Sequence, residues 1–451
     1  MSHLDTIFAL SSGPGVAGVA VIRLSGSGAA MALSAMTGDK PPAIKQATLA
    51  TLIHPKTRKR LDKALVLYFK GPASFTGEDV VELHVHGGVA VVSGVLEALS
   101  ELDGLRMAEA GEFSRRAFDH GKMDLTEAEG LADLIHAQTS CQRDQALQQM
   151  DGALRNIYEG WRTRLISHLA HLEADIDFPD EDLPEGVAGG VLPEIKTLRS
   201  EIDDHLADSK RGRQMRNGFR IVILGAPNAG KSTLMNVLAR SDVAIVSQEA
   251  GTTRDAIEVQ LDLGGYPVRL IDTAGLREGG GSVEQEGMRR TRVHASEADL
   301  CLVMCPSSEW GQLSAESKEI LKGGATLVLS KVDECSITPA QEEINSLGLK
   351  EIYPLSATAD IGVDALLQHL SARVEKEMGV RQAPSLTRLR HQTALIDVAS
   401  HLARFEMNAG VDAVLAAEDV RMAVRALGSI TGMVHVEDIL DVVFSDFCIG
   451  K

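Results

Sequence analysis

The sequence is poor in aromatic residues, and this restricts the kind of core that it can build. Phe, Trp and Tyr together make up 4% of the 451 residues, whereas hydrophobic residues make up 44%. The core must therefore be aliphatic, which favours an α-rich α/β protein. The chain is also longer than one hydrophobic core usually serves, so we expect two or three domains.

Cysteines and long apolar runs are scarce as well. The five cysteines are scattered and odd in number, which argues against a disulfide framework and against a zinc site. Cys301 and Cys305 lie in one apolar segment, and we interpret them as core residues. No apolar run approaches the ~20 residues that a membrane span needs, and no signal-peptide pattern opens the chain. These absences predict a cytoplasmic protein with no membrane partner.

Basic residues are outnumbered. The chain has 45 Lys and Arg against 63 Asp and Glu, a formal net charge of −18. Such a protein does not attract nucleic acid through its overall field, so an RNA contact would need a local patch. Two basic clusters could supply one, and each could equally be a solvated loop or linker. They are Lys56, Arg58, Lys59 and Arg60, and Lys210, Arg211, Arg213 and Arg216.

The first third of the chain alternates strand-like and helix-like segments. We expect strands at 18–24, 48–53, 64–69 and 80–86, and helices at 28–36 and 90–99. From Thr126 the spacing becomes helical, and Thr126 with Glu129 three residues later fits a capping box. A break is expected near Asp151 and Gly152.

A strand at 219–225 opens a self-contained α/β unit that ends near residue 380. The helical segments beyond it would bury too little surface alone, so we expect them to pack against the helices of 126–215. The α/β unit is then an insertion in a helical domain. The expected domains are 1–120, 121–215 with 381–451, and 216–380.

The segment Gly225-Ala-Pro-Asn-Ala-Gly-Lys231-Ser232 fits the P-loop pattern between a strand and a helix. Backbone N–H groups of such a loop wrap the phosphates, Lys231 reaches the β and γ oxygens, and the Ser232 hydroxyl coordinates magnesium. This pattern in this context predicts a nucleotide site.

The other parts of a GTPase follow in order. Thr253 is placed to close on the γ-phosphate and magnesium, Asp272 to support magnesium, and Asp333 to accept hydrogen bonds from guanine. Ser330 stands where such proteins usually have Asn, so we expect one contact to the base and one tie to the P-loop to be missing. The residues expected around the nucleotide are Asn228, Ala229, Gly230, Lys231, Ser232, Thr233, Ser247, Gln248, Glu249, Ala250, Gly251, Thr252, Thr253, Asp272, Thr273, Ala274, Gly275, Lys331, Asp333, Ser356 and Ala357.

The residue after Gly275 is Leu276, which cannot orient an attacking water as Gln does in many GTPases. Glu284, beyond three consecutive glycines, is the best substitute, although a carboxylate that opens a helix explains it equally well. Arg277 lies nearby as a second catalytic candidate. The Asn228 side chain could bind a monovalent cation beside the phosphates and do the charge work of an arginine finger.

Alternation along residues 80–86 places Glu82, His84 and His86 on one face of a strand. Two histidines without a third ligand make a poor metal site, so we interpret them as ordinary surface residues. Glu82 is the more useful side chain if that face borders a pocket.

Taken together, the chain resembles the tRNA modification GTPase family MnmE, also called TrmE. The resemblance runs the full length and includes Ser74-Phe-Thr-Gly-Glu-Asp79, Gly111-Glu-Phe-Ser114, Asp177-Phe-Pro-Asp180, the P-loop, and terminal Phe447-Cys-Ile-Gly-Lys451. It implies an N-terminal α+β dimerisation domain that binds 5-formyltetrahydrofolate, a discontinuous helical domain and an inserted Ras-like P-loop domain.

The resemblance also implies roles for single residues. Arg23, Glu82, Lys122 and Lys451 match the folate-contacting positions of the family. Asn228, Ser247, Glu249 and Thr252 match its potassium loop, and Ser232 and Thr253 bind magnesium. Glu284 falls at the catalytic glutamate of the family, which decides between the two interpretations left open above.

The implied function is potassium-dependent GTP hydrolysis by a homodimer. With a flavoprotein, MnmG, in a heterotetramer, the family adds an aminomethyl-type group to the wobble uridine of tRNA. A rival hypothesis is a nucleotide switch that docks on RNA or ribosomal particles without small-molecule chemistry. The folate-type residues of the first 122 positions favour the enzyme, because a switch would not need them.

Overall fold

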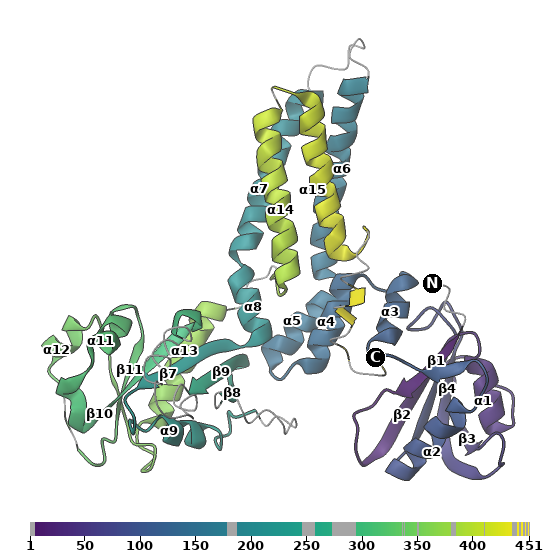
Figure 1. The fold of residues 1–451 in the computed structure, drawn as a ribbon, viewed down its shortest axis with the longest axis horizontal. Coiled ribbons are helices and arrows are strands. Elements are labelled where there is room, and N and C mark those ends of the chain that lie inside the picture. Colours follow the sequence, from purple (N-terminus) through teal and green to yellow (C-terminus); the bar gives the residue numbers. More distant parts are fainter. Residues whose placement is uncertain are drawn as a thin grey trace, which may run out of the picture. The chain divides into compact units, whose positions relative to one another are not determined.

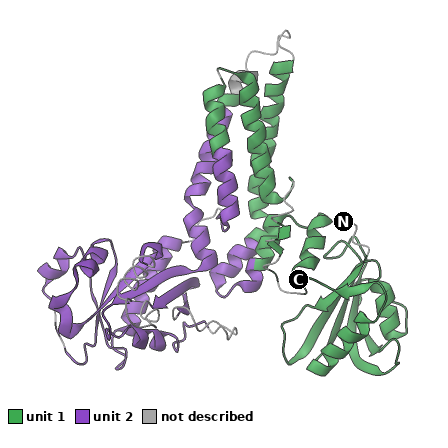
Figure 2. Ribbon diagram, viewed as in Figure 1, with its two compact units in different colours: residues 1–132, 149–192, 400–451 green, residues 133–148, 193–399 purple. Residues whose placement is uncertain are grey.

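The computed structural model describes residues 5–177, 187–245, 258–272, 295–335, 337, 339–349, 351–379, 385–409, 411–434, 440–441, 443–444, 447 and 450. Two compact units account for it (Figures 1 and 2). One comprises residues 1–132, 149–192 and 400–451, and the other comprises 133–148 and 193–399. Each unit holds one six-stranded sheet.

The sheet of the first unit has the strand order β3-β4-β5-β2-β1-β6. Helices α1 and α2 cover one of its faces and close an aliphatic core (Figure 1). The expected strands and helices are confirmed, whereas β1, β6 and α3 were not expected. The bounds are β1 Thr6–Leu10, β2 Ala17–Ser25, α1 Ala29–Thr37, β3 Thr48–Ile53, β4 Arg60–Phe69, β5 Val80–Gly87, α2 Val89–Ser100, β6 Leu105–Met107 and α3 Glu112–Asp119.

Long helices follow, and one expected cap is shifted. The side chain of Asp124, not Thr126, accepts the N–H of Glu127 at 2.8 Å, and Glu127 returns the bond to the N–H of Asp124 at 2.8 Å. The capping box therefore lies two residues earlier than predicted, and Thr126 is buried within the helix. The helices are α4 Leu125–His136, α5 Ser140–Met150, α6 Ala153–Asp177, α7 Val187–Ala207, α8 Ser209–Asn217, α14 Leu389–Asn408 and α15 Ala413–Thr431.

Two further expectations for this region are confirmed. Gly152 has a φ of +83° between α5 and α6, at the predicted break. Helix α15 packs along α6, as expected for a C-terminal segment that needs a helical partner (Figure 1). The division into domains at residues 120, 215 and 380 stays a prediction.

The sheet of the second unit has the order β12-β11-β10-β7-β9-β8. All neighbouring strands are parallel except β8 and β9, which form an antiparallel pair. The elements are β7 Phe219–Gly225, α9 Lys231–Leu238, β8 Glu258–Leu263, β9 Tyr266–Asp272, β10 Leu300–Pro306, the 3₁₀-helix η2 Ser307–Gln312, α11 Ala315–Lys322, β11 Thr326–Ser330, α12 Gln341–Ser346, β12 Tyr353–Leu355 and α13 Val363–Met378. Their order places the carboxyl ends of the parallel strands at one edge, where α/β proteins bind ligands.

Cys305 is buried in this unit, as expected, and burial raises the pKa of its thiol to about 11. Among the described helices, none is long and apolar enough to cross a membrane. The described part of the chain also holds no cluster of His, Cys, Asp and Glu that could bind a metal by itself.

Candidate functional site

The P-loop joins β7 to α9 with the backbone geometry that phosphate binding requires. Gly225 has a φ of +153°, and a Cβ there would come within 2.4 Å of the Met304 backbone oxygen. Asn228 and Gly230 also have positive φ values, +63° and +94°. The Lys231 ammonium donates to the backbone oxygens of Gly225 and Ala226, each at 2.9 Å. The Lys231 side chain therefore bends back onto the backbone of the loop that is expected to bind the phosphates.

A buried carboxylate closes the loop on the side of β9. Asp272 is the last residue of β9, which runs parallel to β7, so its side chain lies beside the P-loop. The Ser232 hydroxyl donates to Asp272 Oδ2 at 2.9 Å, and Asp272 is fully buried. Hydroxyl and carboxylate oxygens are the ligand types that magnesium prefers. The two residues predicted to serve the metal are thus held together.

The opposite end of the same sheet edge holds the residues expected around guanine. Ser330 ends β11, Leu355 pairs with it from β12, and Ser356 follows directly. Lys331 has a φ of +58°, and the buried Ser307 hydroxyl donates to its backbone oxygen at 3.2 Å. This turn presents Asp333 on the surface. Ser356 is buried and exchanges two backbone hydrogen bonds with Ile361, each 2.9 Å long.

The structure corrects one expectation for Ser330. The hydroxyl of Ser330 donates a buried hydrogen bond of 2.7 Å to the backbone oxygen of Ala229 in the P-loop. The tie between β11 and the P-loop, which we expected to be missing, is therefore present. A serine hydroxyl reaches the carbonyl because β11 and the loop lie at the same sheet edge.

In the first unit, Arg23 and Glu82 lie on neighbouring strands and form an ion pair. Arg23 of β2 is opposite Glu82 of β5, and their nearest charged atoms are 2.9 Å apart. The rings of Phe75 and Phe113 lie near the guanidinium, with centroids at 5.4 and 5.9 Å. The pair is partly exposed, at 22% and 17% of the two side chains. Phe113 is fully buried, so a ligand would meet the cation beside the ring of Phe75, an arrangement that suits a flat, anionic ligand.

The segment that carries Phe75 is held by a buried arginine. Arg116 of α3 is fully buried and donates to Glu78 at 3.1 Å and to Glu112 at 2.9 Å. Burial alone would raise the pKa of Glu112, but hydrogen bonds from Arg106, the Glu109 backbone and Arg116 hold it below its usual value. This network fixes the loop of residues 71–79 against α3.

The other two expected folate residues are placed in part. Lys122 is exposed, and a Cβ at Gly77 would lie 3.4 Å from its Cε, so it borders the same loop. Lys451 lies outside the described residues, but its neighbour Gly450 accepts a hydrogen bond of 2.8 Å from the Ser11 hydroxyl. Ser11 follows β1, the strand that pairs with Arg23 through Ala9. The C-terminus thus reaches the sheet that carries Arg23.

The remaining expectations cannot be placed. The residues outside the described ones are Ser247, Gln248, Glu249, Ala250, Gly251, Thr252, Thr253, Thr273, Ala274, Gly275, Arg277, Glu284 and Lys451. The potassium loop other than Asn228, and both catalytic candidates, are among them. Their roles stay predictions.

Comparison with known families decides what these two sites belong to. Residues 6–122 match the family model described as the GTP-binding protein TrmE N-terminus, and residues 125–448 match the MnmE helical domain. The chain belongs to the MnmE (TrmE) family of tRNA modification GTPases. Members of this family hydrolyse GTP, so the P-loop site is that of a GTP hydrolase that acts in tRNA modification.

Full-length relatives agree. The tRNA modification GTPase MnmE of Parvibaculum lavamentivorans is 51% identical over 99% of this chain and 100% of its own length. The mitochondrial 5-taurinomethyluridine-tRNA synthase subunit GTPB3 of Rattus norvegicus is 48% identical over 99% of this chain and 93% of its own. Among solved structures, the FeoB G domain of Methanococcus jannaschii is 23% identical over 35% of this chain and 98% of that chain, with a TM-score of 0.27.

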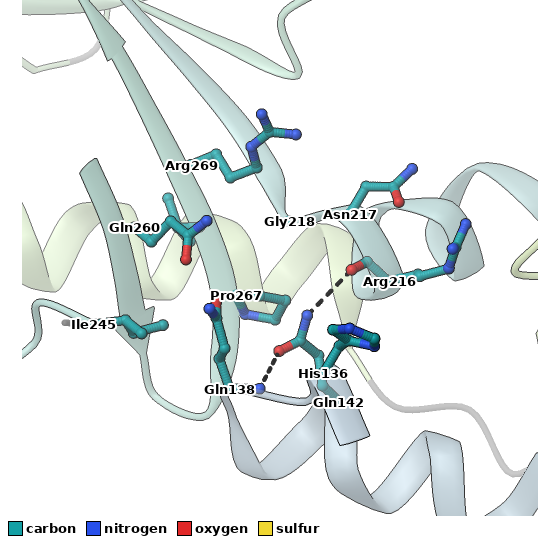
Figure 3. A pocket seen from close by; sticks show the side chains of 11 residues that line it. His136, Gln138, Gln142, Arg216, Asn217, Gly218, Ile245, Gln260, Pro267 and Arg269 are labelled. Atoms are coloured by element: carbon teal, nitrogen blue, oxygen red, sulfur yellow. Dashed lines mark hydrogen bonds between the residues drawn. The ribbon is translucent and has the colours of Figure 1, made fainter. Parts of the chain in front are cut away.

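A polar pocket of about 200 Å³ lies in the GTPase unit, where residues of β8 and β9 meet residues of α5 and α8 (Figure 3). Gln142 of α5 spans it, accepting from the N–H of Gln138 at 3.0 Å and donating to the backbone oxygen of Arg216 at 3.1 Å. Ile245 forms part of its wall. In the sequence, Ile245 stands two positions before Ser247, the first residue predicted to hold potassium after Asn228.

Sequence reasoning missed several residues of the N-terminal site. Phe75 and Phe113 lie inside the two motifs quoted for the family, but only the fold brings them to Arg23. Arg116 gave no signal either, because a single arginine in an amphipathic helix usually faces solvent. The histidines were interpreted correctly: His84 pairs with Glu82 at 3.3 Å and His86 with Asp62 at 2.8 Å.

Proposed function

We propose that this chain is a potassium-dependent GTPase that, with a flavoprotein partner and a reduced folate as one-carbon donor, modifies the wobble uridine of tRNA at carbon 5. The observation that carries the nucleotide half is the Ser232–Asp272 hydrogen bond beside a P-loop of the required geometry. The observation that carries the folate half is the partly exposed Arg23–Glu82 pair, with the ring of Phe75 beside the guanidinium. The chain acts in the cytoplasm in this proposal.

Magnesium and GTP fit the residues of the P-loop. Ser232 and Thr253 would hold the metal, with Asp272 supporting it, and magnesium would neutralise charge between the β and γ phosphates. Lys231 would leave the carbonyls of Gly225 and Ala226 for the phosphate oxygens, while the loop N–H groups bind from the other side. Asp333 would accept hydrogen bonds from guanine. The backbone N–H of Ala357 would donate to the guanine oxygen, because that of Ser356 is bonded to Ile361 and holds the turn in place.

Hydrolysis needs a group that orients the attacking water and a positive charge beside the phosphates. Leu276 offers no polar group to the attacking water. Potassium would supply positive charge beside the phosphates, held by Asn228, Ser247, Glu249 and Thr252. Asn228 has a positive φ, a backbone conformation that asparagine adopts more readily than most residues, so the residue type suits this position of the loop. Glu284 would orient the water, with Arg277 nearby, when two GTPase units of a dimer face each other.

The folate would occupy the outer face of the N-terminal sheet. Arg23, Lys122 and Lys451 would bind its carboxylates, and Glu82 would accept from pterin N–H groups. The partly exposed ring of Phe75 adds a surface on which a flat ring system packs, whereas Phe113 is fully buried beside Arg23. The folate would supply the one-carbon unit.

The same sheet face supports a homodimer. Leu49 and Leu65 form a cross-strand pair on the side away from α1 and α2, and they are 59% and 40% exposed. Exposed apolar area of this kind on a sheet favours contact with a second copy. The flavoprotein MnmG would complete a heterotetramer. The relatives include a mitochondrial 5-taurinomethyluridine-tRNA synthase subunit, which supports a uridine of tRNA as the target.

Potassium exchange tests the mechanism. GTP turnover of the full chain should rise steeply with potassium and little with sodium at equal ionic strength. Glu284→Ala should bind GTP normally and hydrolyse it on the order of 10²–10⁴ times more slowly, because the residue acts on the water and not on the nucleotide. Glu297→Ala, which removes an exposed carboxylate of the same unit, is the matched control. Equal rates in both salts, or wild-type turnover of Glu284→Ala, would refute this mechanism.

A deletion strain tests the function against the rival nucleotide switch. Mass spectrometry of its tRNA should show wobble uridine without the aminomethyl-type group. A switch that only docks on RNA predicts unchanged nucleosides. Complementation with the Arg23→Ala variant should restore GTP hydrolysis but not the modification, because the two sites carry separate chemistry.

A further inference from the structure

The turn between β3 and β4 carries an unusual concentration of positive charge. Lys56, Arg58, Lys59 and Arg60 lie within five positions and all are exposed. Lys56 approaches Glu101 at 3.3 Å, yet 67% of its side chain remains exposed. Among the described residues, no acidic group forms an ion pair with the other three. The basic turn, residues 54–60, therefore presents three exposed cations without an ion-pair partner among the described residues, and a fourth, Lys56, that stays mostly exposed.

The second basic cluster of the sequence is different. Arg211 pairs with Asp208 at 2.6 Å, Arg216 with Asp133 at 3.0 Å and Lys210 with Asp299 at 3.4 Å, while Arg213 donates to Gln392 at 2.8 Å. These side chains form part of helix α8 and its contacts, not an open linker. In a chain of net charge −18, the basic turn therefore gathers four exposed cations within five positions, whereas the cations of the second cluster are paired.

The basic turn is also held in shape before any partner arrives. The N–H of His54 donates to the Lys59 oxygen at 2.8 Å, and the N–H of Arg58 donates back to the His54 oxygen at 2.9 Å. His54 Nδ1 accepts the N–H of Lys56 at 3.3 Å. Arg58 has a φ of +60°, which tightens the turn. A turn fixed in this way loses little backbone entropy when it binds.

We propose that the basic turn contacts the phosphate backbone of the tRNA substrate. This inference rests on the tRNA modification activity of the family and adds the surface that meets the RNA. A phosphate chain is the ligand whose repeated single charges match several exposed cations without a pocket. Such contacts position an RNA without reading its sequence. The turn therefore orients tRNA, and the chemistry stays elsewhere.

A charge-matched pair of variants tests the proposal in the full chain. The first is the triple variant Lys56→Gln, Lys59→Gln and Arg60→Gln. Arg58 is left in place because its guanidinium lies next to Gly38, where α1 ends. The control is the triple variant Lys318→Gln, Lys322→Gln and Lys376→Gln, which removes three charges from α11 and α13 of the other unit. The probe is a fluorescently labelled unmodified tRNA transcript, titrated at several salt concentrations.

The turn variant should bind the transcript at least ~10-fold more weakly near 0.1 M salt, and its log–log salt slope should fall by about 2–3. The control should bind as the wild type does, and both variants should keep GTP turnover. Equal weakening of both variants, or wild-type affinity of the turn variant, overturns the proposal while leaving the tRNA substrate intact. Binding of the turn to anionic phospholipid vesicles with no effect on tRNA also overturns it. If the wild type does not bind the transcript, both tRNA as a ligand of this chain and the proposed role of the basic turn are refuted.

Discussion

The hydroxyl of Ser330 donates a hydrogen bond to the backbone oxygen of Ala229, 2.7 Å away, and both residues are buried. Ser330→Ala leaves that oxygen without its partner, which costs on the order of 1–3 kcal/mol. We expect a lower thermal midpoint and weaker binding of a fluorescent GDP analogue. Ser330→Asn should keep the tie and raise nucleotide affinity by adding an amide contact to the base.

A matched control separates this bond from serine loss in general. Ser346 donates an exposed hydrogen bond to the Glu343 oxygen in the same unit, so Ser346→Ala should change neither property. Identical midpoints and affinities for wild type, Ser330→Ala and Ser346→Ala would show that the buried tie contributes nothing.

Asp333 sets the choice of base. Its carboxylate accepts from two N–H donors of guanine, which adenine cannot offer, so the wild type should prefer GTP to ATP. Asp333→Asn replaces one acceptor by a donor and should weaken GTP binding while improving xanthosine triphosphate binding. Competition titrations with the three nucleotides measure this directly. A wild type that binds ATP and GTP equally would contradict the assignment.

The sequence predicted most of the fold because apolar residues recur with a regular period along its longer strands and helices. The P-loop strand at 219–225 and β3 at 48–53 were predicted at their observed bounds. Short β6 was missed because three residues carry almost no pattern. The capping box shifted by two residues because Asp124, Thr126, Glu127 and Glu129 offer two overlapping boxes, and only the tertiary burial of Thr126 selects one.

Site residues were predictable from the sequence where each lies in a recognisable local motif. They were not predictable where their role depends only on how distant segments pack. Ser232 and Asp272 are far apart in the chain, but each sits in a recognisable motif, and parallel β7 and β9 bring them together. The Ser330–Ala229 bond was not predictable, because its existence depends on how closely β11 approaches the P-loop. Phe75 and Phe113 reach Arg23 only through the fold of the loop and α3.

The Arg23–Glu82 pair gives a prediction for the folate. Calorimetry with 5-formyltetrahydrofolate should show binding to the intact chain, and Arg23→Ala should abolish it because the guanidinium is the partly buried cation of the site. Phe75→Leu should weaken binding while keeping the charge. Lys45→Ala, an exposed lysine of the same unit, is the control and should bind normally. Heat signals that are absent for the wild type, or equal for all four proteins, would count against a folate site here.

His205 predicts how stability depends on pH. Burial lowers the pKa of His205 in α7 to about 4; Asp208 opposes this and His391 adds to it. In the unfolded chain the imidazole titrates near its ordinary pKa of about 6.5. Between pH 6.5 and pH 4, therefore, the imidazole is protonated in the unfolded state but neutral in the folded state. The stability that this group contributes is complete above pH 6.5 and falls as the pH drops toward 4.

The loss expected from this group is on the order of 2–3 kcal/mol, after allowance for the partial exposure of the side chain. His205→Gln removes the proton site, so its thermal midpoint should fall less than that of the wild type between pH 7 and pH 4.5. The comparison uses the difference between the two proteins, because carboxylates titrate alike in both. His171→Gln, which replaces an exposed histidine of α6, is the control and should follow the wild type. If His205→Gln and the wild type lose stability in parallel as the pH falls, His205 is not neutral by burial and titrates as an ordinary surface histidine.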